Sequence, residues 1–126
     1  MATLTSQAIG EGDFVERAAD PIDLAILGRF TANNRELQVE VLKLFADHLP
    51  IPLDLLGESA SAADWRYATH TIKGAARAVG ASALAAVAAE AETASVADRG
   101  RHTRRIRAEA EAALAFVHRF SAPAAG

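Results

Sequence analysis

The sequence predicts an all-α protein, an antiparallel four-helix bundle with an additional short N-terminal helix. Apolar residues recur at alternating spacings of three and four along successive segments, as on the buried face of a helix, and no segment alternates with period two as a strand does. Capping residues, glycines and prolines separate these segments by short connections. Short connections between amphipathic helices favour antiparallel neighbours, and therefore a bundle.

A chain of 126 residues suggests one domain. We expect a flexible N-terminal extension over residues 1–19, the helical bundle over residues 20–121 and a C-terminal tail over residues 122–126. The short N-terminal helix is predicted to begin at Asp20 and Pro21, because aspartate is a good N-cap and proline suits the first helical position. Its apolar face consists of Leu24, Leu27 and Phe30.

The second helix is predicted to follow a cap at Asn33 or Asn34. Pro50 and Pro52 interrupt it, because a proline inside a helix removes a hydrogen bond and clashes with the preceding turn, at a cost of ~3 kcal/mol. We expect a kink or break there and a further turn or two up to Gly57. The apolar residues of this helix are Leu37, Val41, Leu42, Leu44, Phe45 and Leu49.

The third helix is predicted to begin after Ser61, which together with Asp64 resembles a capping box, and to end at Gly80 as its C-cap. His70 lies about 200° around the helix from the apolar residues two positions away on either side, so it is predicted to face solvent. The residues predicted to face the core are Trp65, Ala68, Ile72, Ala75 and Val79.

Two more helices are predicted after the third. The fourth covers about residues 82–97, with Leu84, Val87 and Ala91 facing inward, and residues 98–100 form a turn. The fifth covers about residues 102–120, and the arginine-rich run 99–107 is expected to be a solvated face. The apolar stripe of the fifth helix consists of Ile106, Ala110, Ala113, Val117 and Phe120.

The composition excludes several classes of protein. The formal net charge of -3 gives no basic footprint for nucleic acid, and the absence of cysteine excludes disulfides and thiolate chemistry. The first residues lack the basic and apolar regions of a signal peptide, and no apolar stretch approaches the roughly 20 residues that span a bilayer. We therefore expect a cytoplasmic protein with neither a nucleic-acid nor a membrane partner.

The third helix brings His70, Lys73 and Gly74 together, since residues three and four apart are neighbours on a helix surface. A neutral imidazole can be a nucleophile, and a lysine beside it can balance the charge of phosphoryl oxygens. Glycine inside a helix costs ~1 kcal/mol relative to alanine. Gly74 therefore either leaves room for an incoming group or packs closely against another helix. The three residues together favour a site at which His70 carries a phosphoryl group.

The segment Thr69-His70-Thr71-Ile72-Lys73-Gly74, with Gly80 ten positions after the histidine, resembles the histidine-containing phosphotransfer (HPt) domains of bacterial multistep two-component systems. The resemblance implies that His70 accepts a phosphoryl group from the aspartate of one receiver domain and passes it to another. It also implies that Lys73 is the charge partner and Gly74 the residue that gives steric clearance. No cofactor is expected, because any magnesium would belong to the receiver.

The chain has neither a Gly-rich phosphate loop nor a nucleotide fingerprint, so we expect a monomeric phosphocarrier and not an enzyme. Arg66, Tyr67 and Arg77 lie on the same broad face as His70 and are candidates for contact with the receiver partner. Docking is expected on this face together with exposed parts of the second helix.

Three alternatives are less well supported. The dimerisation bundle of a sensor kinase usually has an acidic residue directly after its histidine, whereas Thr71 follows here. A helical metal enzyme needs inward-facing ligand pairs such as His-x-x-x-His or Glu-x-x-His, and the histidines form neither. A helical interaction module that is not phosphorylated would normally lack the histidine. His48, His102 and His118 are expected at the surface or at helix ends, and Trp65 as a core or edge anchor.

Overall fold

The computed structural model describes residues 20–122, and within this range every regular element is a helix. The predicted all-α class is confirmed. The elements in chain order are α2 (Leu24–Thr31), α3 (Arg35–His48), α4 (Pro50–Leu53), α5 (Ala62–Val79), α6 (Ser82–Glu92), the 3₁₀ turn η1 (Val96–Asp98) and α7 (Arg99–Ser121).

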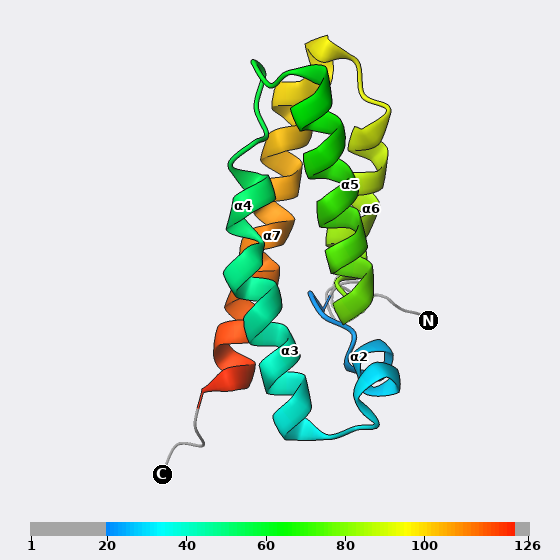
Figure 1. The fold of residues 1–126 in the computed structure, drawn as a ribbon, viewed down its shortest axis with the longest axis vertical. Helices are drawn as coiled ribbons and strands as arrows, with labels where there is room; N and C mark the ends of the chain where they lie inside the picture. The colour runs from blue at the N-terminus through cyan, green and yellow to red at the C-terminus, as the bar shows by residue number, and fades with distance from the viewer. Residues whose placement is uncertain (1–19, 123–126) are drawn as a thin grey trace, which may run out of the picture.

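The helices form an antiparallel four-helix bundle with a short helix added at its N-terminal side (Figure 1). The four members of the bundle are α5, α6, α7 and the combined α3 and α4. The helices α5 and α6 lie side by side, α6 lies against α7, and α7 lies against α3, while α2 crosses the end of the bundle near α3 and α5. The side chains at the centre include Leu27, Leu42, Ala68, Ile72, Leu84 and Ile106.

The break predicted at Pro50 is present but only one residue long. Leu49 keeps right-handed helical angles (φ -59°, ψ -36°), and its N–H still donates to the carbonyl of Phe45. The N–H of Asp54 then donates to the carbonyl of Pro50, so α4 continues nearly along the direction of α3 (Figure 1). The two prolines therefore interrupt the hydrogen bonding without turning the chain.

The start of α2 differs from the prediction. The helix begins at Leu24 with Asp23, not Asp20, as its N-cap, and the Asp23 side chain accepts from the N–H of Ala25. The N–H of Asp23 donates to the carbonyl of Gly80, which ties this residue to the end of α5 in an extended conformation and prevents an earlier helical turn. Of the predicted apolar face only Leu27 is buried, whereas Leu24 and Phe30 are exposed; Ile22 and Thr31 are buried in their place.

The caps predicted for α3 and α5 are confirmed. Asn34 caps α3 by accepting from the N–H of Leu37, and Ser61 caps α5 by accepting from the N–H of Asp64. Gly80 ends α5 in the left-handed conformation with φ 83°. A Cβ atom there would lie 2.7 Å from the carbonyl oxygen of Asp23, so the close approach of the chain also requires glycine.

The predicted end of α6 and the predicted start of α7 were wrong by several residues. The helix α6 ends at Glu92 and not near residue 97, because the carbonyl of Ala91 accepts from the Trp65 indole and from the N–H of Ala94. The predicted turn 98–100 is instead the passage from η1 into α7, which begins at Arg99 and not at residue 102. The inward-facing residues predicted for both helices are buried, except that Phe120 is only partly so.

The arginine-rich run is not simply a solvated face. Arg99 donates to the carbonyl of Ala60, and its guanidinium lies 5.2 Å from the centre of the Trp65 ring. Arg107 donates to the carbonyl of Leu53, and Arg105 pairs with Glu90 at 2.8 Å. These side chains connect α7 to the ends of α4, α5 and α6.

The positions of the three histidines outside α5 agree only in part with the expectation. His102 is buried with 7 % of its surface exposed, because its position on α7 faces the bundle. His48 and His118 are exposed, as expected. The expected N-terminal extension 1–19 lies outside the described residues, as do residues 123–126 of the expected tail.

Candidate functional site

The side chain of His70 projects from the middle of α5 into solvent. It is 74 % exposed, while the residues on the opposite side of the helix, such as Ala68 and Ile72, are fully buried. The helical repeat predicts this placement, since the core-facing stripe of α5 fixes which side of the helix remains outside. An imidazole in this position can be reached by a reactive group that another protein carries.

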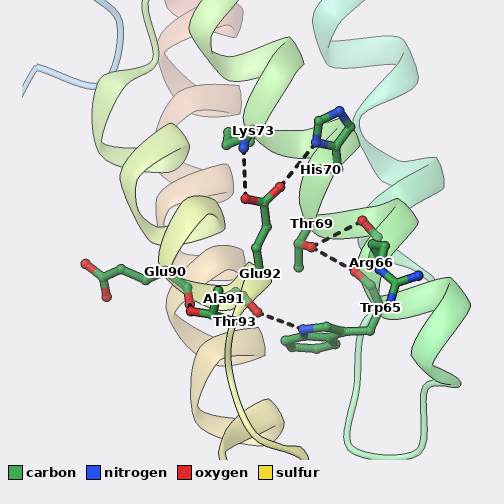
Figure 2. A network of polar contacts seen from close by, with 9 residues as sticks. All are labelled: Trp65, Arg66, Thr69, His70, Lys73, Glu90, Ala91, Glu92 and Thr93. Atoms are coloured by element: carbon green, nitrogen blue, oxygen red, sulfur yellow. Dashed lines mark hydrogen bonds and ion pairs between the residues drawn. The ribbon is translucent and has the colours of Figure 1, made fainter.

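A carboxylate from the neighbouring helix completes the site. Glu92, the last residue of α6, lies between His70 and Lys73 (Figure 2). Its Oε2 atom is 3.2 Å from Nδ1 of His70, and its Oε1 atom accepts a hydrogen bond of 2.8 Å from Nζ of Lys73. One carboxylate therefore binds both the imidazole and the ammonium group.

The charge state of Glu92 determines which ring nitrogen of His70 carries the proton and which carries the lone pair. The hydrogen bond from Lys73 holds the pKa of the Glu92 carboxyl below its ordinary value, burial opposes this shift, and the hydrogen bond from His70 adds to it. An ionised carboxylate only accepts hydrogen bonds, so the proton between the two groups belongs to Nδ1. In the neutral ring Nε2 then carries the lone pair, and it lies on the side of the imidazole away from Glu92 (Figure 2).

Lys73 is less available than the sequence suggests. Its side chain is 17 % exposed and its ammonium is engaged by Glu92. A lysine on the histidine side of a helix would be expected to extend into solvent, but the end of α6 lies beside it. In this structure the cation is part of a Lys73–Glu92–His70 chain, with a neutral net charge when the imidazole is neutral.

Gly74 faces open space. A Cβ atom at this position would have no neighbouring atom within 4 Å, and the backbone is helical with no positive φ. Close packing against another helix therefore does not explain the glycine. The absent side chain leaves a gap on the surface one turn from His70.

Two hydrogen bonds fix the part of α5 that carries the site. The indole Nε1 of Trp65 donates to the carbonyl of Ala91 at 2.8 Å, which joins α5 to the end of α6 directly before Glu92 (Figure 2). The hydroxyl of Thr69, which is fully buried, donates to the carbonyl of Trp65 at 2.9 Å. The anchoring role predicted for Trp65 agrees with its 3 % exposure.

The predicted partner-contact residues divide into two groups. Arg66 and Tyr67 are exposed and, with His70 and Glu92, line a shallow hollow on one side of the imidazole. Arg77 is also exposed, but it lines a different hollow between α2 and α6, next to Gly80. The structure therefore brings Arg66 and Tyr67 to the histidine and places Arg77 two helical turns away.

An apolar groove lies on the other side of the same helix face. It has a volume of about 260 Å³ and runs between α5 and the combined α3 and α4. Thr71 and Ala75, which are neighbours of His70 and Gly74 in the chain, form one wall. The other wall includes Leu44, which is 58 % exposed, and His48.

Sequence reasoning did not place Glu92 in the site, although a signal for it exists. His70 lies ten residues before Gly80 and Glu92 twelve residues after it. Because α5 and α6 are antiparallel and joined directly at this glycine, residues at similar separations from it lie at the same level of the bundle. The register of the hairpin could therefore have indicated the contact.

Two kinds of feature are absent from residues 20–122. No group of three or more histidine, cysteine, aspartate or glutamate residues there could hold a metal ion. In the same range, no helix has both the length and the apolar character needed to cross a membrane.

A helical bundle that presents one exposed histidine beside a cation and a helical glycine defines a class of phosphotransfer domain. The sequence model of the Hpt domain matches residues 40–116, which include His70, Lys73, Gly74 and Glu92. The match covers more than half of the chain, and the chain therefore belongs to the Hpt domain family. No curated protein and no solved structure matches it. Domains of this family take part in histidine phosphotransfer, are generally phosphocarriers and not kinases, and interact with receiver domains.

Proposed function

We propose that this chain relays a phosphoryl group between the aspartates of two receiver domains, by way of a phosphohistidine at His70. The observation that carries this proposal is the exposed imidazole whose Nδ1 is engaged by Glu92, leaving Nε2 free. Family membership supports the reaction class, and the geometry supports the residue.

The reaction at His70 follows from the free nitrogen. The Nε2 lone pair attacks the phosphorus of a receiver's aspartyl phosphate, a bond forms between nitrogen and phosphorus, and the bond from phosphorus to the aspartate oxygen breaks. The aspartate leaves as a carboxylate, and in the reverse direction a carboxylate of the second receiver attacks the same phosphorus. Any magnesium that shields the phosphoryl oxygens is supplied by the receiver.

Gly74 gives the receiver room to bring its phosphoryl group to the imidazole. In-line attack requires the reacting atoms to approach to about 3–3.5 Å, so backbone of the partner must come close to α5. The open space around Gly74 supports this role.

The docking surface extends on both sides of His70. The apolar groove shares α5 with the histidine, and the exposed side chain of Leu44 on α3 lines it. Ile51 on α4 is exposed as well. Arg66 and Tyr67 provide polar and aromatic contacts on the opposite side. Transient signalling contacts of this kind often bury no more than ~1,200 Å² in total, which a surface of this extent can supply.

The test is transfer from a receiver labelled with radioactive phosphate to the purified chain and to two variants. We expect His70→Gln to abolish labelling and His118→Gln, the matched control at an exposed histidine of α7, to be labelled like the wild type. Circular dichroism spectra should be the same for all three, because neither side chain is part of the core. Equal labelling of His70→Gln would refute the assignment of the phosphohistidine to His70. No labelling of the wild type by any receiver would refute the relay in favour of an interaction module that is not phosphorylated.

The chain is also proposed to act as a monomer. An obligate dimer in size-exclusion chromatography would instead favour the dimerisation bundle of a sensor kinase.

A further inference from the structure

The apolar groove beside His70 has polar side chains at only two positions. Ten residues of the described range line the groove, and among them only His48 and Thr71 are polar. His48 is the last residue of α3, and Thr71 on α5 directly follows His70 in the chain. A receiver that brings a phosphoryl group to His70 therefore comes to lie beside this groove.

The size of the groove suits a side chain of a docked protein better than a separate small molecule. Pockets for drug-sized ligands have volumes of about 300–1,000 Å³ and cover most of the ligand surface. The groove has a volume of about 260 Å³, and Leu44 on its wall is 58 % exposed. One apolar side chain of a receiver can fill such a groove while the receiver backbone remains outside.

One nitrogen of His48 shows what the groove can recognise besides apolar surface. Nδ1 of His48 lies 2.9 Å from the carbonyl oxygen of Leu44, and a carbonyl oxygen only accepts hydrogen bonds. The ring proton is therefore on Nδ1, and Nε2 of the neutral ring is left as an acceptor. The side chain is exposed, and within residues 20–122 its hydrogen bond is made by Nδ1 alone. The lone pair of Nε2 is therefore open to a donor on a partner.

We propose that His48 selects among receivers by accepting a hydrogen bond at the groove. The receiver that it favours carries an apolar side chain for the groove and, next to it, an N–H or O–H group that donates to Nε2. A receiver without this donor removes water from Nε2 and does not replace the lost hydrogen bond, so it docks less tightly. This inference rests on the proposed function and adds to it the chemistry of the preferred partner.

The first experiment compares transfer from a set of phosphorylated receivers to the wild type and to His48→Phe, which keeps an aromatic ring but has no acceptor. Each second-order rate constant is divided by the rate at which phosphoramidate, a small phosphoryl donor, labels the same protein. This division removes any change in the reactivity of His70 itself. We expect the preference for the best receiver over the others to fall about tenfold in His48→Phe, which is the scale of one hydrogen bond.

Three other variants show whether the effect belongs to the acceptor. His48→Gln provides a carbonyl oxygen near the position of Nε2 and should retain most of the preference. Leu44→Ala shortens the apolar wall and should slow transfer from all receivers alike, so that the preference stays the same. His118→Phe, at an exposed histidine of α7, is the matched control and should behave as the wild type.

The second experiment observes the hydrogen bond itself. In ¹H–¹⁵N spectra of histidine side chains, the signal of an unprotonated ring nitrogen moves when that nitrogen accepts a hydrogen bond. We expect the Nε2 signal of His48 to move when the preferred receiver is added in its unphosphorylated form, and the signals of His118 to stay in place.

Three outcomes overturn the inference. The first is a His48→Phe variant with the same preference among receivers as the wild type. The second is a preference that His48→Gln loses as completely as His48→Phe does. The third is an Nε2 signal of His48 that does not respond to the bound receiver. In each case the wild type still accepts the phosphoryl group from receivers, whereas failure of the proposed function leaves the wild type unlabelled by every receiver.

Discussion

Two substitutions at Gly74 are expected to separate the stability of the fold from phosphotransfer. A Cβ atom at this position meets nothing within 4 Å, and the backbone is helical. Alanine should therefore gain its full advantage in helix propensity over glycine, about 0.8–1 kcal/mol, without steric cost. For a domain of this size, 1 kcal/mol raises the melting temperature by roughly 4–8 °C. We expect Gly74→Ala to melt about 3–8 °C above the wild type.

A longer side chain at the same position should keep the stability and lose the reaction. Gly74→Gln extends over the surface one turn from His70, where the phosphoryl donor must approach, and a misplacement of about 1 Å can slow transfer roughly 100-fold. Thermal unfolding by circular dichroism and transfer from a phosphorylated receiver measure the two effects separately. Ala108→Gln, which adds the same side chain to an exposed position on α7, is the control.

Either of two results would contradict this role of Gly74. A destabilised Gly74→Ala would mean that the glycine serves packing or backbone conformation after all. Transfer at the wild-type rate by Gly74→Gln would mean that the receiver does not pass over this part of α5.

Two further predictions concern stability. Gly80→Ala should destabilise the fold by about 2 kcal/mol in urea titrations, because alanine is strained at φ 83° and its Cβ would lie 2.7 Å from the carbonyl oxygen of Asp23; a neutral effect would contradict the close approach. The Glu92 carboxyl has a folded-state pKa lowered from 4.5, so its ionic contacts add stability above about pH 4.5, and this contribution is lost as the pH falls through the lowered pKa. The free energy of unfolding of the wild type minus that of Glu92→Gln should therefore shrink on acidification, and a difference that is constant between pH 7 and pH 3 would contradict this assignment.

Much of the fold follows from local sequence signals. The stripe of apolar residues on α5 predicts both its buried side and the exposure of His70, and the caps at Asn34, Ser61 and Gly80 act within a few residues of where they stand. The same locality explains why the break at Pro50 could be predicted, since a missing N–H donor is a property of the residue itself.

The errors in the predicted helix boundaries occur where distant parts of the chain form hydrogen bonds with backbone groups at the helix ends. Asp20 is a good cap in isolation, but the carbonyl of Gly80 engages Asp23 and delays the start of α2. The helix α6 ends early because the Trp65 indole takes the carbonyl of Ala91. Glu92 joins the site through contact between helices, which no spacing within one helix reveals.

The indole that joins α5 to α6 is also the only tryptophan of the chain. Its emission therefore comes from one known place, the buried side of α5 five residues before His70, where the indole is bonded to the residue preceding Glu92. Unfolding exposes this indole to water and shifts its spectrum, so stability can be followed without a label. Any rearrangement at the end of α6 during phosphorylation would alter the same signal, which gives the domain an intrinsic optical probe of its own chemistry.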